Sequence, residues 1–428
     1  MPTTVDNGSS ISVKRFSVAL FAQTQQSPSM LRNLTGGAPK QSDAEAKLKL
    51  QSSPDMPVVR ITDLARAAGD TVTMDCVDII GGYPIMGDRN AEGRGRALTF
   101  SSMETKINAA TFVIDAGGKM AQQRTEHTLR PLALANGKGQ MTRYEAQSSI
   151  VHLSGARGSL LHASHAIPLS THADFDEIMV NPVKAPSYNR HFVVSGGAGA
   201  ALSQGGLALD TIAVGDVARV EMLDNIRLRL DRMELPLQPI KLPDDPARND
   251  EPLYLLLAPP GAFDSFKTSS GTNIRTYQQA AWTRASYGSK HPLFMGEVYM
   301  WNNILVRKMT DFWVQFAPAE TTKYNTAANL LGQETGVATI PALGGTHRVE
   351  RCLLLGAQAM ANCYGRSQSS DFYYSWLERK YNFERATEIA CESMGGKAKV
   401  RFDVPQPDGT KATTDHGVIV IDCAAKNA

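Results

Sequence analysis

The segment of residues 69–114 constrains the fold most, because it places two strand-like runs on either side of a long polar tip. Residues 71–80 and 107–114 are rich in β-branched and apolar side chains, which predicts two strands. The first run stops at the turn formers of residues 81–84, and residues 87–96 consist of turn formers and charges. An isolated two-stranded ribbon is marginally stable in water. We therefore expect this hairpin to rest on another surface, of its own chain or of another molecule.

Length and composition indicate a folded chain of several units. The 428 residues correspond to roughly two to four units at about 100–200 residues per domain. With 42% hydrophobic and 20% charged residues, disorder of the whole chain is excluded. Lys and Arg total 44 against 42 Asp and Glu, and this net charge of +2 disfavours tight, sequence-reading binding of DNA. No run approaches the ~18 apolar residues of a membrane span, so we expect no membrane partner.

The cysteines favour a reducing, cytoplasmic folding compartment. They are odd in number, lie far apart and include no C-x-x-C pair, so neither a disulfide framework nor a zinc cluster is indicated: Cys76, Cys352, Cys363, Cys391 and Cys423. Residues 16–22 resemble the apolar centre of a signal peptide, but the run is short, starts late and leads into a Gln-rich stretch. We therefore do not expect secretion.

The first third of the chain contains an arm, the hairpin and a helix. Residues 1–57 are polar and interrupted by prolines, so we expect a poorly packed arm that does not fold by itself. Residues 118–155 carry apolar residues at helical spacing. Because Pro131 removes a backbone hydrogen bond, and Gly137 and Gly139 weaken a helix, we expect two helical segments rather than one straight rod.

Helices and strands alternate in the remainder of the chain. The spacing of apolar residues predicts a helix over 216–233, with Asp216 as its N-cap. The apolar run 253–258 between prolines predicts a buried central strand, residues 296–309 a further strand, and residues 350–364 a helix. This alternation indicates an α+β fold.

Two strand-like runs lie near the C-terminal end. Residues 398–404 alternate apolar with charged side chains, and residues 417–423 are β-branched. The connector contains the turn signal Asp408-Gly409. We expect the two runs to pair as antiparallel strands.

Candidate catalytic and metal-binding groups lack the spacing that such sites need. His162, His165 and His172 form the densest potential metal group, but no acid stands at a recognised spacing beside them. The glycine cluster 196–199 matches no phosphate-binding motif, and no serine or cysteine lies in a nucleophile motif. We therefore assign no catalytic, cofactor-binding or metal-binding residue and expect no cofactor, although sites built from distant residues leave no local motif.

A set of motifs spans most of the chain, at residues 63–73, 81–88, 91–93, 107–110, 152–158 and 415–422. Together they resemble the major capsid proteins of tailed bacteriophages of the coliphage N-four-like family. The resemblance implies the Hong Kong 97 type capsid fold: an N-terminal arm, an extended hairpin called the E-loop, a peripheral domain with a long spine helix, and an axial domain at the capsomer centre. The corresponding ranges are residues 1–57 for the arm, 58–114 for the E-loop region, 115–215 and 385–428 for the peripheral domain, and 216–384 for the axial domain.

Membership of such a family implies a structural function rather than an enzymatic one. We expect many copies to self-assemble into pentamers and hexamers that form an icosahedral head around double-stranded phage DNA, so that the protein is located in the virion after assembly in the host cytoplasm. The resemblance also implies decoration, portal and scaffold proteins as partners, and weak, nonspecific contact with DNA. The candidate residues for contact between subunits, at the E-loop tip, are Asp88, Arg89, Glu92, Arg94 and Arg96.

Two other functions stay open on the sequence alone. An α/β-type hydrolase would use the histidines of residues 162–172. A carbohydrate-binding component of a virion tail would need no catalytic group. Self-assembly of the purified chain into particles of MDa mass would distinguish a capsid protein from both.

Overall fold

Two β-sheets that share no strand carry most of the structure. The computed structural model describes residues 34–35, 52, 54–62, 69–77, 83–87, 89–95, 97–98, 100–119, 123, 129–162, 165–197, 201–233, 235–241, 253–268, 298–327, 334–366, 374–381, 383, 385–405 and 410–427. The larger sheet has eight strands, in the order β6 (Ala201–Gln204), β5 (His191–Ser195), β19 (Val418–Lys426), β13 (His347–Leu355), β7 (Tyr254–Ala258), β9 (Ile304–Lys308) and β8 (Val298–Trp301), with β10 (Gln315–Phe316) beside β13. The smaller has five, in the order β1 (Val58–Ile61), β14 (Met360–Tyr364), β16 (Ala386–Lys399) and β15 (Tyr374–Tyr381), with β4 (Asn108–Gly118) also paired to β16.

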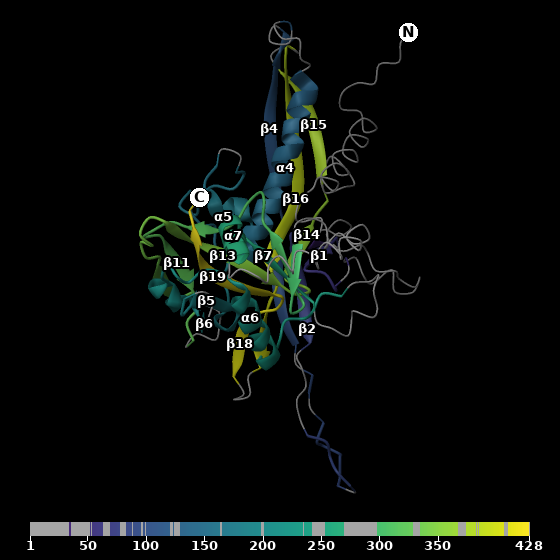
Figure 1. The fold of residues 1–428 in the computed structure, drawn as a ribbon. Coiled ribbons are helices and arrows are strands. Elements are labelled where there is room, and N and C mark those ends of the chain that lie inside the picture. Colours follow the sequence, from purple (N-terminus) through teal and green to yellow (C-terminus); the bar gives the residue numbers. More distant parts are fainter. Residues whose placement is uncertain are drawn as a thin grey trace.

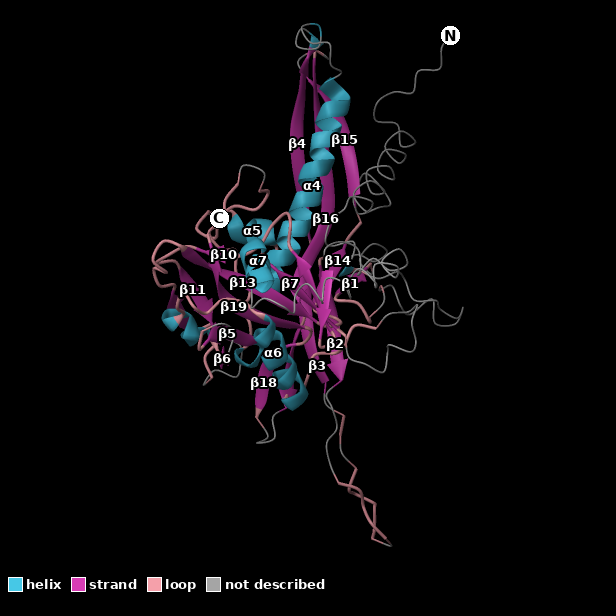
Figure 2. Cartoon of the chain, viewed as in Figure 1, coloured by secondary structure: helices cyan, strands magenta, loops and turns pink. Residues whose placement is uncertain are grey.

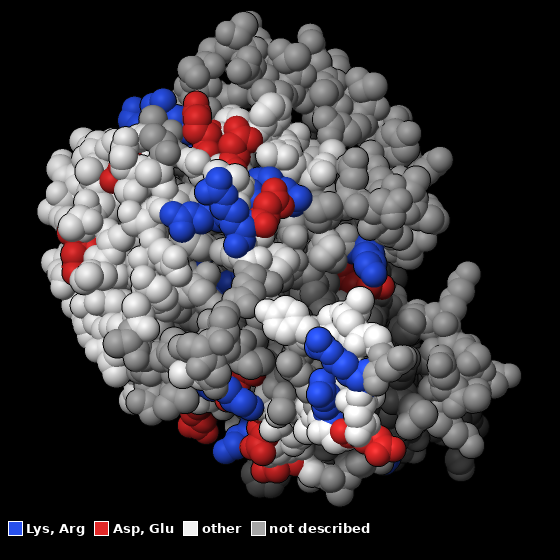
Figure 3. All heavy atoms as spheres, turned by 90° about the horizontal axis from the view of Figure 1, so that it is seen from below, with Lys and Arg blue, Asp and Glu red and all other residues white. Residues whose placement is uncertain are grey.

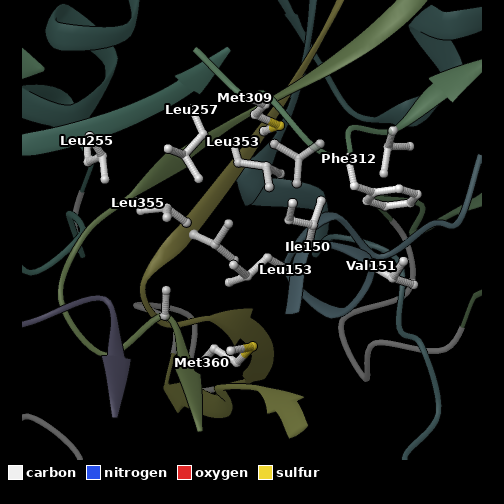
Figure 4. Packing of buried hydrophobic residues seen from close by; sticks show 14 of the residues in the cluster. Ile150, Val151, Leu153, Leu255, Leu257, Met309, Phe312, Leu353, Leu355 and Met360 are labelled. Atoms are coloured by element: carbon white, nitrogen blue, oxygen red, sulfur yellow. The ribbon is translucent and has the colours of Figure 1, made fainter. Parts of the chain in front are cut away.

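The larger sheet is buried on both faces. On one face, Leu257 and Leu353 pack in the same cluster as Leu153 of α4 (Leu129–Ser154), as Figure 4 shows. On the other face, the alternate residues Leu256 and Leu354 pack with residues of α6 (Val220–Arg232) and α7 (Pro260–Thr268). Burial on both faces explains the continuous apolar run of β7, and it confirms the predicted buried strand over 253–258.

Two other predicted elements differ from the structure. The helix predicted for residues 350–364 is wrong, because this range contains most of β13 and all of β14. Its apolar residues are buried in β13 of the larger sheet and in β14 of the smaller sheet, and a run that is buried throughout has no period that separates a strand from a helix. Residues 296–309 are a hairpin of β8 and β9 rather than one strand, turned at Asn302 and Asn303 with φ of 47° and 61°, values that Asn tolerates well.

β4, β15 and the first part of β16 form an elongated three-stranded sheet, which projects from the body beside α4 (Figures 1 and 2). β16 is its central strand, and the end of β16 continues into the body, where it pairs with β14. Ile389 and Cys391 of β16 pack with Met141 of α4. One face of the elongated sheet is therefore covered by the helix.

α4 is continuous, so the prediction of two helical segments is wrong over Leu129–Ser154. Pro131 lies in the first turn, where a missing N–H costs no intrahelical hydrogen bond. Gly137 lies where the helix meets the sheet, because a Cβ there would approach the Cys391 Sγ to 2.7 Å. Most of residues 118–128 of the predicted helix lie outside the described residues.

The predicted hairpin has a different second strand. β2 (Thr71–Val77) pairs antiparallel with β3 (Phe100–Lys106), whereas β4, which contains most of the predicted run 107–114, pairs with β16. In β3, burial alternates along the strand, so that Ser101 and Thr105 face the body. The base of the ribbon packs in a cluster with Phe402. The expectation that the ribbon rests on another surface is thus confirmed at its base, where that surface belongs to the same chain.

The pairing predicted near the C-terminal end is also wrong. β17 (Arg401–Pro405) pairs with β18 (Lys411–Asp415), and β19 lies in the larger sheet between β13 and β5. The reason is burial: eight of the nine residues of β19 are buried, which only a central strand provides. The Asp408-Gly409 turn signal lies outside the described residues.

The helix predicted over 216–233 is confirmed as α6, but it begins at Val220 and Asp216 does not cap it. The Asp216 carboxylate instead accepts hydrogen bonds from the backbone N–H groups of Gly197 (2.9 Å) and Ala213 (2.8 Å). Shorter elements complete the body: α5 (Phe175–Met179), the 3₁₀ helices η2 (Tyr188–Arg190) and η3 (Gly206–Thr211), and the pair β11 (Thr321–Tyr324) and β12 (Gly336–Thr339). No described helix combines the length and the apolar character that crossing a membrane requires.

Two described parts of the predicted arm are packed on the body. Leu34 and Met56 are buried in the main core, and Thr35 forms a parallel bridge with Val58 of β1. The expectation of a poorly packed arm is therefore wrong at these positions, where apolar side chains reach the core. Most of residues 1–57 lie outside the described residues.

Candidate assembly surface

The ribbon of β2 and β3 continues into a tip segment, residues 83–98, that extends away from the body (Figures 1 and 2). Every described residue of this tip segment is exposed. The Arg94 N–H donates to the Ala91 carbonyl over 3.3 Å, and Gly93 has a φ of 77°, so the turn is held by its own backbone. A Cβ built at Gly93 or Gly95 would have no heavy atom within 4 Å beyond its chain neighbours. The tip segment is therefore available for contact with another molecule.

The structure places three of the five predicted contact residues. Arg89, Glu92 and Arg94 are exposed on the tip segment, whereas Asp88 and Arg96 lie outside the described residues. The Glu92 N–H donates to the Asn90 side-chain carbonyl over 2.9 Å, which shapes the backbone but leaves the Glu92 carboxylate at the surface. What these side chains contact in an assembly stays a prediction.

The sequence analysis named only charged residues as contact candidates, but the same ribbon also exposes apolar side chains. Val77 and Phe100 are opposite each other at the end of the paired strands and are 57% and 60% exposed. Tyr83, Met86 and Leu98 continue the apolar surface outward, with exposures of 96%, 68% and 57%. Complete burial of one such side chain contributes about 1.5–3 kcal/mol, so this surface can bind strongly. The signal was present in the sequence as the run Tyr83-Pro84-Ile85-Met86 inside a polar tip.

Asn181 anchors the base of the ribbon. Its side-chain oxygen accepts from the Lys106 N–H (2.9 Å), and its NH₂ group donates to the carbonyls of Lys106 (2.9 Å) and Lys397 (3.1 Å). The residue before it, Val180, has a φ of 65° and a ψ of −55°, which is strained for a β-branched residue. The strained turn places Asn181 between the end of β3 and β16, where its hydrogen bonds link the two strands.

Alternate basic residues of β16 and β17 join the sheets and α4 through buried ion pairs. Lys397 Nζ lies 2.7 Å from Glu145 Oε2 of α4. Lys399 Nζ and Arg401 Nε lie 2.9 and 2.7 Å from the two oxygens of Asp415. Burial lowers the pKa of Lys399 to about 8; burial would raise the pKa of Asp415, but Arg401 and Lys399 lower it to about 2. These buried ion pairs link β16 and β17 to α4 and β18, and they are not accessible to solvent.

The histidines of residues 162–172 do not assemble a catalytic or metal site in the described structure. His165 packs edge-on against Phe312, and its Nδ1 lies 3.4 Å from an Arg157 nitrogen. Burial and the neighbouring Arg157 lower the pKa of His165 to about 4. Among the described residues, no group of three or more His, Cys, Asp and Glu side chains could hold a metal ion.

A groove of about 600 Å³ lies between α6 and the β5–β6 edge and is lined by Arg190, Arg229 and Arg232. Arg190 is already occupied, since its guanidinium donates to the Asp415 carbonyl (3.2 Å) and the Leu235 carbonyl (2.6 Å). On the face of the molecule seen in Figure 3, basic and acidic side chains alternate without one dominant sign. The described residues of this face therefore form no broad basic surface of the kind that binds DNA tightly.

Comparison with known proteins was made by sequence and by fold. The sequence model described as "Phage capsid protein" matches residues 4–427. No curated protein matches the chain. Among solved structures, the capsid of Ralstonia phage GP4 is similar, with a TM-score of 0.69, 21% identity, and coverage of 93% of this chain and 92% of that chain.

Two more distant capsid structures share the fold. The Cyanophage Pam1 capsid has a TM-score of 0.57 and 15% identity, and covers 88% of this chain and 90% of its own. The capsid of the Helicobacter pylori bacteriophage KHP30 has a TM-score of 0.53 and 10% identity, with 90% and 92% covered. At such identities the likeness shows the fold.

Proposed function

The chain belongs to the family of phage capsid proteins, and we propose that its E-loop, the ribbon of β2 and β3 with the residues between them, joins each copy to a neighbouring copy. The protein is a major capsid protein, a component of the virion that forms the head shell, and it has the Hong Kong 97-like fold. The observation that carries the proposal is the exposed tip segment. It has no contact with its own body at Gly93 or Gly95, and it presents Tyr83, Met86 and Leu98 to solvent.

The copies assemble as pentamers and hexamers around double-stranded DNA. A net charge of only +2 limits repulsion between many identical subunits. Portal, scaffold and decoration proteins are further partners in this proposal, assembly takes place in the host cytoplasm, and the contact with DNA is weak and nonspecific. The role is structural rather than enzymatic, so the proposal replaces the α/β-type hydrolase and the carbohydrate-binding tail component.

The domains of the capsid fold correspond to the two sheets. The elongated sheet with α4 forms the peripheral domain, in which α4 is the spine helix, and the larger sheet forms the centre of the axial domain. The larger sheet takes β5 and β6 from the range 115–215, β19 from the range 385–428, and the other strands from 216–384. In this proposal the axial domain therefore includes parts of the chain on both sides of 216–384.

Deletion of residues 85–98 tests the proposed function. We expect a folded subunit, with unchanged far-UV circular dichroism, that forms no shells in electron micrographs, because the described residues of this segment are all exposed. The same is expected, more weakly, of the pair Tyr83→Ser and Met86→Ser. The matched control, Leu207→Ser with Val337→Ser, removes side chains that are 63% and 59% exposed elsewhere on the body and should leave assembly intact. Normal shells from the deletion variant would refute the proposal.

A further inference from the structure

The groove between α6 and β6 is built from both polar and apolar side chains. Its volume of about 600 Å³ is within the range of about 300–1,000 Å³ that is usual for ligand pockets. Leu228 of α6 is 48% exposed in its lining, and Arg229 and Arg232 of the same helix also line it. Arg190 of η2 and Thr414 of β18 complete this side of the groove, and α6, β6 and β18 lie in the same part of the body (Figure 1). The groove thus combines apolar and basic side chains from distant parts of the chain.

The lining of the groove carries positive charge. No Asp or Glu among the described residues lines it, whereas three arginines do. The two aspartates of α6 are engaged elsewhere. Asp224 accepts from the indole N–H of Trp301 over 2.7 Å, and Asp231 lies 3.0 Å from Arg227. An anionic ligand therefore meets no repelling carboxylate in the described lining.

Buried groups behind the groove add further positive charge. Arg190 is only 3% exposed, and its guanidinium donates to the backbone carbonyl of Asp415 over 3.2 Å. The Asp415 carboxylate is itself shared by Lys399 and Arg401, at 2.9 and 2.7 Å. One carboxylate thus faces three basic groups, and the low dielectric of the interior strengthens the potential of the excess charge. The groove therefore attracts anionic groups.

β6 gives the groove an open strand edge. It pairs with β5 on one side and with no described strand on the other. The Gly205 N–H donates to the His191 carbonyl, so Gly205 and every second residue before it direct their backbone groups toward β5. Leu202 and Gln204 direct theirs away from β5, and the Leu202 carbonyl accepts from Arg229 over 2.8 Å. This edge therefore borders the groove, and its outward backbone groups can pair with an added strand.

We propose that this groove binds an extended, acidic peptide segment of a second protein, which adds a strand to β6. Pairing along β6 turns every second side chain of the segment toward α6. There Arg229 and Arg232 bind the carboxylates, and Leu228 packs against the methylene groups of the same side chains. A peptide fits better than the backbone of DNA, because phosphate groups use neither an open strand edge nor an apolar wall. The inference goes beyond the proposed function, since the E-loop takes no part in it.

Binding of a synthetic peptide to the unassembled subunit tests the proposal. The probe is a fluorescein-labelled peptide of alternating Glu and Val, and a labelled peptide of alternating Lys and Val is the control for charge. We expect the anisotropy of the acidic peptide to rise to saturation and that of the basic peptide to stay unchanged. Rising salt should weaken the binding, because it screens the charges. Binding of both peptides alike, or of neither, would overturn the proposal.

A substitution on α6 locates the bound peptide. Arg232→Glu changes an exposed residue of the lining and should lower the affinity about tenfold, which corresponds to one charge-assisted hydrogen bond. Arg348→Glu makes the same change of charge at an exposed position outside the groove, and it should bind like wild type. Equal affinities of the two variants would refute the proposed site. A labelled oligothymidine that binds as tightly as the peptide, and that Arg232→Glu releases, would show a nucleic-acid site instead.

A substitution on β6 tests the pairing of strands. Gln204→Pro removes an outward N–H without removing a hydrogen bond to β5, and proline is tolerated on edge strands. We expect several-fold weaker binding of the acidic peptide. Gln204→Ala keeps the N–H and should bind like wild type, and circular dichroism checks that both variants are folded. If the proline variant binds as well as the alanine variant, the peptide does not pair with β6 and the proposal fails.

Discussion

Arg351 and Asp422 lie directly opposite each other on β13 and β19 and form a bidentate ion pair without contact to solvent. Arg351 Nε donates to Asp422 Oδ1 over 2.7 Å, and Nη2 donates to Oδ2 over 2.9 Å. Nη1 donates to the carbonyl of Ser154 at the end of α4, and His191 Nε2 lies 2.7 Å from the same carboxylate. The pair thus ties the larger sheet to the helix of the elongated sheet.

Replacement of Arg351 by Met should strongly destabilise the subunit. The change leaves the Asp422 carboxylate buried without its main counter-charge, which typically costs about 3–5 kcal/mol. Urea unfolding of the unassembled subunit measures the effect. Arg348→Met, an exposed change on the same strand, is the control and should cost little. Equal midpoints for the two variants would show that the buried pair contributes nothing.

Acid should destabilise the subunit through Asp422. Burial would raise the pKa of this carboxyl, but Arg351 and the hydrogen bond from His191 lower it to about 2, below its ordinary value of 3.8. A folded-state pKa below the unfolded value contributes stability that is present above about pH 4 and lost as the pH falls to 2. We therefore expect Asp422→Asn to be much less stable than wild type at pH 5 and closer to it at pH 2, as followed by thermal unfolding. A difference that stays constant over this range would contradict the assignment; Asp176→Asn, at an exposed position on α5, should show no difference at either pH.

Glu350 should have the opposite effect on the pH dependence. Burial raises the pKa of its carboxyl to about 7, although the Ala262 N–H donates to it over 2.8 Å. Because the folded-state pKa lies above the ordinary value of 4.5, its contribution is full below about pH 4.5 and is lost as the pH rises through 7. Glu350→Gln keeps an acceptor for Ala262 and removes the titration. The variant should therefore unfold at a higher temperature than wild type at pH 8 and lose that advantage at pH 5; an advantage of the same size at both values would argue against a raised pKa.

Two glycines of α4 should respond oppositely to alanine. Gly→Ala in an exposed helix interior stabilises by up to about 1 kcal/mol, and a Cβ at Gly139 would have nothing within 4 Å. At Gly137 the Cβ would meet the Cys391 Sγ at 2.7 Å, and overpacking of this kind costs about 1–3 kcal/mol. Gly139→Ala should raise the melting temperature and Gly137→Ala should lower it. The same sign for both would show that the helix is not held against β16 at Gly137.

The sequence predicted those elements whose pattern is local. The helix near 216–233 repeats its apolar residues every three to four positions, and β7 is a short apolar run between prolines. The helix is buried on one face and the strand on both, and either kind of burial gives a pattern that can be recognised within a few consecutive residues. The exposed tip of the E-loop followed from its turn formers in the same way.

The elements that the sequence did not predict depend on distant parts of the chain. β13 and β14 look like one helix because apolar residues dominate both, and only the sheet around them distinguishes the two structures. The partner of β17 could not be deduced, because β18 and β19 are both strand-like and only one is apolar enough for the centre of a sheet. Gly137 indicates a break in a helix, but in the structure it is the position at which the helix touches β16.

The sequence indicated an exposed tip but not its apolar residues, and the contact between subunits at this tip stays a prediction. The location of Arg89, Glu92 and Arg94 on an exposed tip followed from the sequence. The apolar residues Tyr83 and Met86 are visible in the sequence as a run inside a polar tip, but only the folded molecule shows that they are exposed. The groove between α6 and β6 was not predictable, because its lining comes from parts of the chain that are distant in sequence.

The position of β19 has a consequence for synthesis of the protein. β19 fills the middle of the larger sheet, yet the ribosome makes it after every other strand of that sheet. A polypeptide released before residue 418 therefore has β5 and β13 with a missing neighbour, and it cannot complete its core. We therefore expect truncated translation products to lack a folded larger sheet and to be unable to join a shell.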